Sequence, residues 1–120
     1  MAKFFVKSSW GTDDPTRAAM AFGHSNALAR KGHAVRIFLV GDAVLLARAP
    51  IRESLQPIGW PPLSVQWREC LSHGVEIEVC EACRIARGIS DEDIREFGAT
   101  IGTPDTFEAG MMWADKIFTE

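Results

Sequence analysis

A parallel strand–helix–strand unit is indicated by the mainly apolar run Ala34-Val35-Arg36-Ile37-Phe38-Leu39-Val40, which Gly41 and Asp42 close. An apolar run of this length that ends at glycine is typical of a buried parallel strand. A shorter run of the same kind, Phe4-Phe5-Val6, lies near the N-terminus. Because a segment with helical spacing separates the two runs, we predict a right-handed β–α–β unit over residues 4–40.

The helix inside this unit has recognisable ends. Asp14 is placed to cap it, and Pro15 takes the first helical position, where the missing N–H costs nothing. Arg30 complements the dipole at the far end, and Gly32 ends the helix. The spacing i, i+3, i+4, i+7 of a buried face is followed by Ala18, Ala21, Phe22, Ser25, Leu28 and Ala29.

Strands and helices continue to alternate after residue 42. We expect a short helix over 43–49 that Pro50 ends, a loop over 51–62 and a helix over 63–71. Further strands are predicted at 75–79, 99–102 and 116–119, with helices that start near Cys80, at Ser90 with Asp93 in a capping box, and at Thr103. The prediction is one α/β domain over residues 1–120, a three-layer sandwich with a five-stranded, mostly parallel sheet and helices on both faces.

One strand departs from the usual pattern. Glu76 and Glu78 share one face of the predicted third strand, whereas a central parallel strand is usually apolar on both faces. Either this strand lies at an edge of the sheet, or its second face meets polar partners or another subunit.

Composition restricts the classes of function. The 120-residue chain is 47% hydrophobic and has a net charge of −3, so neither a nucleic-acid nor an anionic-membrane surface is expected. No stretch is a signal peptide or approaches the ~20 apolar residues of a membrane span. Three cysteines, an odd number, argue against a secreted disulfide framework. We therefore expect a cytoplasmic protein with reduced thiols and no cofactor.

Cys80 is the strongest candidate for chemistry. It opens the motif Cys80-Glu81-Ala82-Cys83 at a predicted strand-to-helix turn. Open α/β sheets bind ligands at the carboxyl ends of their strands, and the free N–H groups of a helix start stabilise a thiolate and lower its pKa. Cys83, one turn further on, is expected to face inward as a structural thiol or to serve as a resolving thiol.

A zinc site is a weaker hypothesis. Cys70 and His73, followed by Cys80 and Cys83, resemble a four-ligand set. The predicted strand between the two pairs spans about 20 Å, whereas zinc ligands gather within about 2.3 Å of one ion. We therefore expect no metal, with Cys70 in the core and His73 at a helix end.

The loop after the first strand should lie on the same rim as Cys80. It contains a single glycine and matches neither a P-loop nor a dinucleotide fingerprint. Its side chains are nevertheless candidate neighbours of the thiol. Arg84 and Arg87 add positive charge after Cys80, which Glu78 and Glu81 oppose. The candidate site-lining residues are Ser9, Trp10, Thr12, Asp13 and Arg84.

Three segments of the chain resemble motifs of the DsrE/DsrF-like family. These are residues 7–18, residues 32–42 and the cysteine motif at residues 79–89. The resemblance implies the DsrE-like fold and homotrimers or homohexamers built from it. It also implies that Cys80 carries sulfur as a persulfide, as the first cysteine does in relay members of the family. The presence of Cys83 departs from the sulfur-relay subunits.

Three functions stay open. The first is a sulfurtransferase-like sulfur carrier that uses Cys80, with a sulfur-donor or sulfur-acceptor protein as partner. The second is a thiol–disulfide oxidoreductase that uses Cys80 and Cys83, although the Trp-Cys-Gly-Pro-Cys neighbourhood of thioredoxins is absent. The third is a non-catalytic oligomeric binding or assembly module. A homo-oligomer is favoured by Ile58 and Trp60, which a monomer covers poorly in a loop.

Overall fold

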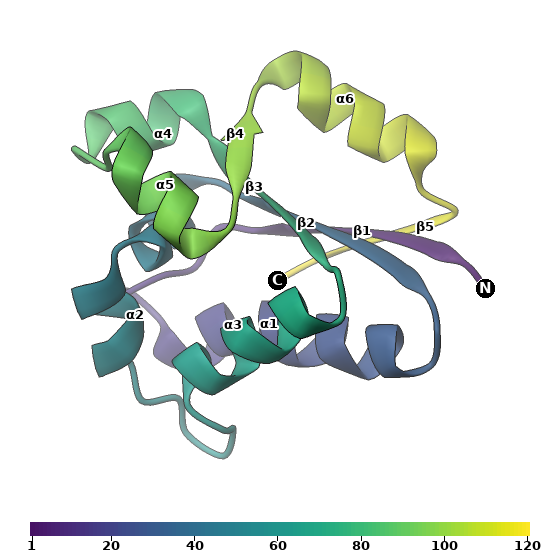
Figure 1. Ribbon diagram of the computed structural model, residues 1–120, viewed down its shortest axis with the longest axis horizontal. Helices are drawn as coiled ribbons and strands as arrows, with labels where there is room; N and C mark the ends of the chain where they lie inside the picture. Colours follow the sequence, from purple (N-terminus) through teal and green to yellow (C-terminus); the bar gives the residue numbers. More distant parts are fainter.

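The computed structural model describes residues 1–120 (Figure 1). A five-stranded sheet has the order β4-β3-β2-β1-β5, and all four strand pairs are parallel. The strands are β1 (Lys3–Ser8), β2 (Ala34–Leu39), β3 (Glu76–Cys80), β4 (Thr100–Gly102) and β5 (Lys116–Thr119). The predicted α/β fold is therefore confirmed, and the sheet is wholly parallel.

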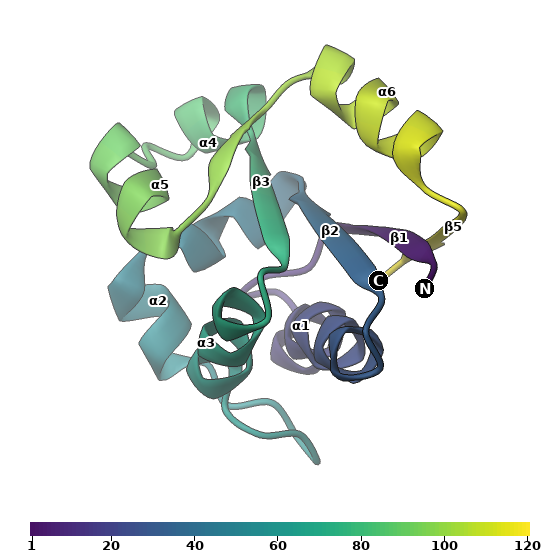
Figure 2. The same ribbon diagram turned by 45° about the vertical axis from the view of Figure 1, so that its right-hand side comes forward.

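Helices cover both faces of this sheet. They are α1 (Pro15–Arg30), the 3-10 helix η1 (Gly41–Ala47), α2 (Ala49–Ser54), α3 (Leu63–Ser72), α4 (Glu81–Ala86), α5 (Asp91–Phe97) and α6 (Pro104–Trp113). Figure 2 shows α1 and α3 together on one face, with α6 on the other face and α4 near it. None of these helices is long and apolar enough to cross a membrane.

The predicted starts of α1 and α5 are confirmed in detail. The Asp14 carboxylate accepts a hydrogen bond from the Arg17 N–H at 3.0 Å, and Pro15 follows as the first helical residue. Ser90 and Asp93 form the predicted capping box of α5, with bonds of 3.0 and 3.1 Å. These ends are encoded locally, because each cap needs only residues three positions apart.

The prediction for residues 43–62 is wrong in part. The first helix, η1, begins at Gly41 and ends at Ala47, and a second helix, α2, then runs through Ser54 where a loop was expected. Pro50 lies in the first turn of α2 and does not end a helix. Proline has no backbone N–H, but the N–H groups of the first helical turn have no partner within the helix. A proline can therefore mark the start of a helix as well as its end.

The face of the sheet that packs on α1 and α3 holds the main core. Alternate residues of the central strands, among them Val6, Ile37 and Val79, are buried in a cluster of 21 apolar residues that also includes Trp67. At its edge the Arg52 side chain is almost fully buried: its guanidinium lies 3.9 Å from the Trp67 ring centre and pairs with the Glu96 carboxylate at 2.6 Å.

The opposite face, toward α6, is mixed. Three aromatic rings, of Phe5, Phe38 and Phe107, lie 5.4–6.1 Å apart between ring centres. At Gly110 the backbone of α6 approaches the sheet so closely that an added Cβ would collide with the Phe5 ring. Only glycine therefore allows this contact.

The same face explains the glutamates of β3. This strand lies between β2 and β4 and is not an edge strand. Arg36, on the neighbouring strand, pairs with Glu76 at 2.9 Å. Glu78 is half-buried, and desolvation raises the pKa of its carboxyl above the usual range, although Arg36 opposes the shift. The glutamates of β3 are therefore explained by polar partners on the second face of the sheet and not by a position at its edge.

The loop between α2 and α3 carries the two residues expected at an interface. Ile58 is 84% exposed. Trp60 is half-buried, because its ring packs edge-on against His24 at 5.3 Å between ring centres and lies against Gly23 of α1. The apolar exposure of this loop therefore comes from Ile58 more than from Trp60.

Candidate functional site

Cys80 is the last residue of β3 and the residue that precedes α4. Because side chains alternate along a strand, Cys80 shares the α6-facing side of β3 with Glu76 and Glu78. Its register partner on β4 is Gly102. A Cβ at Gly102 would lie 2.6 Å from the Phe38 ring, so a glycine is needed here to bring β4 beside this part of the sheet.

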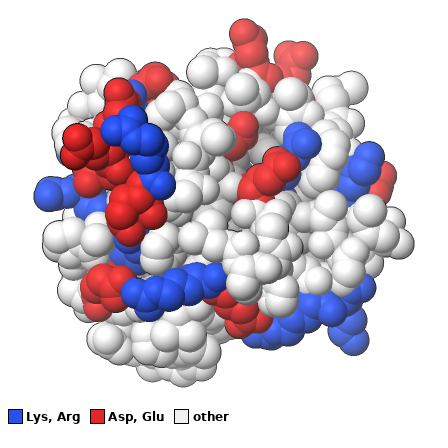
Figure 3. Space-filling view, in the orientation of Figure 1, with Lys and Arg blue, Asp and Glu red and all other residues white.

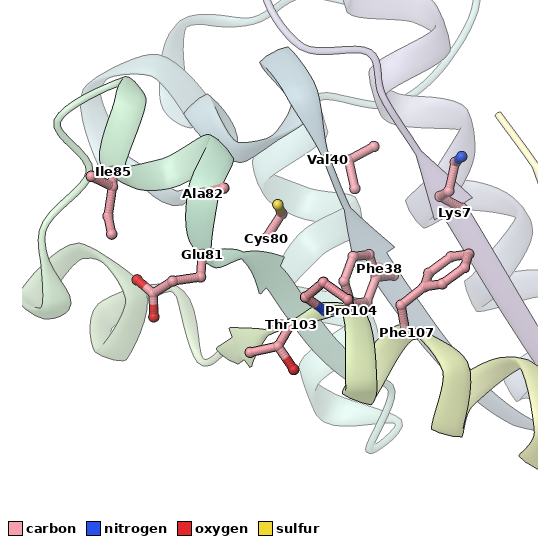
Figure 4. A pocket seen from close by; sticks show the side chains of 11 residues that line it. Lys7, Phe38, Val40, Cys80, Glu81, Ala82, Ile85, Thr103, Pro104 and Phe107 are labelled. Atoms are coloured by element: carbon pink, nitrogen blue, oxygen red, sulfur yellow. The ribbon is translucent and has the colours of Figure 1, made fainter.

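A cavity of about 690 Å³ opens beside the thiol, between α4, α6 and the carboxyl ends of the central strands (Figure 4). Six of its eleven lining residues are hydrophobic, so its walls are mainly apolar. The lining residues are Lys7, Phe38, Val40, Cys80, Glu81, Ala82, Ile85, Gly102, Thr103, Pro104 and Phe107. A volume of this size matches small-molecule sites, which are commonly about 300–1,000 Å³.

Three polar side chains besides the thiol line the cavity, and two of them already have partners. The Glu81 carboxylate pairs with the Arg84 guanidinium at 2.6 Å. The Thr103 hydroxyl caps α6 by accepting a hydrogen bond from the Thr106 N–H at 3.2 Å. The Lys7 ammonium has neither an ion pair nor a side-chain hydrogen bond, and it lies 5.9 Å from the centre of the Phe107 ring. Lys7 is therefore the free charge of the site.

The net effect of the surroundings on the Cys80 thiol is opposite to the predicted one. Burial raises the pKa of Cys80 above its ordinary value, because desolvation disfavours the thiolate. The backbone N–H groups of Cys83 and Ala82 oppose this shift, as expected at a helix start, but the nearby Cys83 thiol adds to it. The predicted lowering of the pKa is wrong, because burial of the thiol and the neighbouring Cys83 thiol outweigh the N–H groups.

The other two cysteines have different surroundings. Cys83 is half-buried against the core, and its sulfur accepts a hydrogen bond from the Gly41 N–H at 3.2 Å. Cys70 is fully buried on α3, donates to the Phe22 carbonyl at 3.5 Å and has a pKa raised to about 12 by burial. Only Cys80 lines the cavity.

The loop after β1 does not line the cavity. Ser9, Thr12 and Asp13 are exposed, and Arg17 lies 4.7 Å over the Trp10 ring. The loop folds back on itself, because Asp13 accepts a hydrogen bond from the Gly11 N–H at 2.8 Å. It also packs against the backbone of Asp42 at the start of η1.

Arg84 is also outside the cavity lining. Its guanidinium pairs with Asp91 at 2.8 Å as well as with Glu81, and it donates to the Ile89 carbonyl at 3.1 Å. Arg87, the next cation, pairs with Asp42 at 3.0 Å. Both arginines after Cys80 therefore form ion pairs with carboxylates of the protein. Figure 3 shows acidic and basic side chains crowded together on the side of the molecule that carries α5.

Several cavity residues were not predicted from the sequence. Lys7, Phe107 and Thr103 come from β1, α6 and the start of α6, all far from Cys80 along the chain. One signal points to Lys7: in the alternation of β1 it follows Phe5 on the same face, at the carboxyl end of the strand. The contribution of α6 has no local signal, because it depends on how that helix packs.

No group of three or more His, Cys, Asp or Glu side chains is arranged to hold a metal ion. His73 ends α3, where its ring pairs with Glu69 at 3.0 Å, and Cys70 points into the core. The cysteines of the 80–83 motif lie at the other end of β3. The two pairs of a hypothetical zinc set are thus kept apart.

Comparison with known proteins identifies a family that matches nearly the whole chain. The model of the DsrE/DsrF-like family matches residues 1–119. An uncharacterized protein of Methanopyrus kandleri is 33% identical over 66 residues, which are 55% of this chain and 51% of that protein. An uncharacterized protein of Methanocaldococcus jannaschii is 28% identical over 102 residues, or 85% of this chain and 37% of that protein. The chain spans about half or less of the length of these curated relatives.

Solved structures share the fold. The ychN protein from E. coli superposes with a TM-score of 0.79 at 21% identity, over 100% of both chains. A protein of unknown function from Bacteroides thetaiotaomicron gives a TM-score of 0.72 at 21% identity, over 99% of this chain and 95% of that one. At such identities the likeness shows the fold alone, whereas the family match extends over nearly every residue. The chain belongs to the DsrE/DsrF-like family.

Proposed function

We propose that the protein carries sulfane sulfur as a persulfide on Cys80. The observation that supports this role is that Cys80, alone among the three cysteines, lines the cavity of about 690 Å³. A persulfide lengthens the side chain by one sulfur atom, and the cavity offers room for that atom beside the thiol (Figure 4).

The transfer requires no external oxidant or reductant. In loading, the Cys80 thiolate attacks the terminal sulfur of a donor persulfide, a new S–S bond forms to Cys80, and the S–S bond of the donor breaks. The donor leaves as a thiolate and takes up a proton. In unloading, an acceptor thiolate attacks the outer sulfur on Cys80, and Cys80 departs as a thiolate. Sulfane sulfur moves between two thiols, so electrons balance in each step.

The backbone around Cys80 assists this departure. The N–H groups of Cys83 and Ala82 stabilise negative charge on the Cys80 sulfur. Because burial nevertheless holds the pKa of Cys80 above its ordinary value, most of the free thiol is protonated at neutral pH. Loading should therefore accelerate as the pH rises.

The decisive test is intact mass after exposure to a sulfane donor. The wild type should gain the mass of one sulfur atom, and a reductant should remove it. Cys80→Ser should abolish the gain, whereas Cys83→Ser and Cys70→Ser should retain it. Thermal unfolding of Cys80→Ser provides the control for folding. A wild type that takes up no sulfur, or a Cys80→Ser variant that does not fold, would contradict the proposal.

A thiol–disulfide oxidoreductase is the second candidate, because the Cys83 side chain interacts with the Cys80 thiol. A disulfide between them has to form across the first turn of α4, where Cys83 is held by the Gly41 N–H. Disulfide geometry is strict, so we expect this bond to form poorly. Rapid, reversible loss of two protons on mild oxidation, titratable against glutathione, would favour the oxidoreductase over the carrier.

We also propose that the chain forms a homotrimer or homohexamer and exchanges sulfur with a donor or acceptor protein. Ile58, 84% exposed on the loop before α3, is an apolar side chain that an interface between copies of the chain would cover. Light scattering should give a mass three or six times that of the 13.2 kDa chain. A stable monomer at micromolar concentration would contradict the assembly without affecting the chemistry of Cys80.

A further inference from the structure

We infer that the cavity takes a small organic sulfur compound whose apolar body ends, opposite the sulfur, in one anionic group held by Lys7. The inference rests on the proposed sulfur chemistry of Cys80 and specifies the substrate class of that site. Three observations carry it: the free charge of Lys7, the separation of Lys7 from Cys80, and the apolar surface between them.

The ammonium of Lys7 is the one cation available to a ligand in the cavity. Lys7 is half-buried on β1 and lines the cavity, yet it has no ion pair and no side-chain hydrogen bond. The guanidinium groups after Cys80 differ, because Arg84 and Arg87 pair with carboxylates of the protein. A cation beside apolar surface without a partner favours a bound anion, since the interaction gains strength where water is scarce.

The register of the sheet fixes how far this charge lies from the thiol. Lys7 is opposite Phe38 of β2, and Phe38 is opposite Glu78 of β3, two residues before Cys80. Two interstrand spacings of about 4.8 Å place the backbone of Lys7 roughly 10 Å or more from that of Cys80. A ligand that contacts both side chains must therefore be longer than an inorganic anion.

The surface between the two groups is apolar. Figure 4 shows Lys7 and Cys80 at opposite sides of the cavity, with Phe38 and Val40 between them and Phe107 beside Lys7. A polar body would lose its hydrogen bonds with water against these side chains, which disfavours it. An aryl ring or a short alkyl chain fits both the spacing and the surface.

The charge distribution also limits the ligand to one anionic end. On the α4 side, near Cys80, no free cation is available to a second negative group, because Arg84 already pairs with Glu81 and Asp91. The ligand class is thus an aryl or alkyl persulfide with a carboxylate or sulfonate remote from the sulfur. Its sulfane sulfur would reach Cys80 while its anion binds Lys7.

Binding can be tested without any sulfur chemistry. We would titrate ¹⁵N-labelled protein with 3-phenylpropionate and with its neutral amide, and follow the backbone signals of Ala82 and Thr103. The wild type should bind the acid about fivefold more tightly than the amide, the upper range for a single partly exposed ion pair. Lys7→Met should lose this preference and retain binding of the amide.

Lys3→Met is the matched control. Lys3 lies on the same face of β1 without an ion pair, but it sits over Trp113 and does not line the cavity. It should keep the preference for the acid. Equal affinity of acid and amide in the wild type would overturn the inference, and so would an equal loss in both lysine variants, which would indicate only a general effect of charge.

Failure of this inference is distinguishable from failure of the proposed function. If Cys80 loads sulfur but neither probe binds, the substrate class is overturned and the carrier function stands. If neither probe binds and the amides of Ala82 and Thr103 are protected from solvent exchange in a self-associated protein, a second copy of the chain covers the cavity. That result would also overturn the inference. Selective binding of the acid by a protein that loads no sulfur would leave Lys7 as an anion site and overturn the sulfur chemistry.

Discussion

The two faces of the sheet are built by the same strands, yet they differ in almost every physical property. The face toward α1 and α3 is closed over a cluster of 21 buried apolar residues. The face toward α6 carries charged residues of three central strands, Lys7, Arg36 and Glu78 among them, and leaves a cavity of about 690 Å³. Because one closed face supplies most of the hydrophobic stabilisation, the other can hold a reactive group and empty space.

The largest contrast should appear in the reactivity of the two thiols. Cys70 is fully buried on the closed face, whereas Cys80 lines the cavity. In a Cys83→Ser background, iodoacetamide should modify Cys80 at least about a thousandfold faster, since Cys70 reacts only when the core opens. The Cys80 rate should still rise past about pH 8.5, where an ordinary thiol is half ionised, because its pKa is raised. Peptide mapping against time would measure both rates, and comparable rates would erase the contrast.

Truncation of one phenylalanine on each face of the sheet should show that the two faces contribute differently to the free energy of unfolding. Phe22 is fully buried on α1, and Phe22→Ala should lower the free energy of unfolding by about 3–5 kcal/mol. Phe107 is half-buried beside the cavity, so Phe107→Ala should lower it by no more than about 2 kcal/mol. Urea denaturation measures both values. Equal losses would mean that the α6 face contributes as much to stability as the closed one.

Alkaline pH should act mainly through the closed face. The pKa of Cys70 is raised to about 12 in the folded protein, against about 8.5 when unfolded. The protonated thiol therefore stabilises the fold below pH 8.5, and this contribution is lost as pH rises toward 12, by up to about 1.4 kcal/mol per pH unit. The chain has no tyrosine to obscure the effect. Cys70→Ala should flatten the alkaline slope, whereas Cys80→Ser should change it little.

The smallest effect concerns Glu78 on the cavity face. Desolvation raises the pKa of its carboxyl, so the ionised form weakens the fold at neutral pH. Glu78→Gln should therefore raise the free energy of unfolding at pH 7 by less than about 1 kcal/mol. The gain should vanish below about pH 4, where the glutamate is protonated in both states. A loss of stability at pH 7 would show that the attraction of Arg36 outweighs desolvation.

The sequence predicts those features that nearby residues determine. Asp14 with Pro15 and Ser90 with Asp93 mark helix starts correctly, because each cap acts within one turn. Pro50 misleads, since the same residue suits a helix start and a helix break. The position of Cys80 at the end of β3 follows from the alternation of the strand, so the location of the candidate thiol is predictable as well.

The rest of the site depends on contacts between distant segments. Lys7 and Phe107 reach the cavity through strand register and the docking of α6, which no local pattern specifies. The predicted direction of the pKa shift at Cys80 is wrong for the same reason. The N–H groups that lower this pKa belong to neighbours in sequence, whereas the burial that raises it depends on how the rest of the chain packs around Cys80.

The close approach of Gly110 to Phe5 offers a way to change the size of the cavity by a single substitution. Gly110 does not line the cavity, but it sets how near α6 can lie to the sheet. Substituting alanine there would act as a spacer that lifts the helix, enlarging the chamber while every wall residue and the thiol keep their chemistry. Room for a bulkier ligand could thus be gained through a single position outside the walls, without any change to the residues that line the cavity.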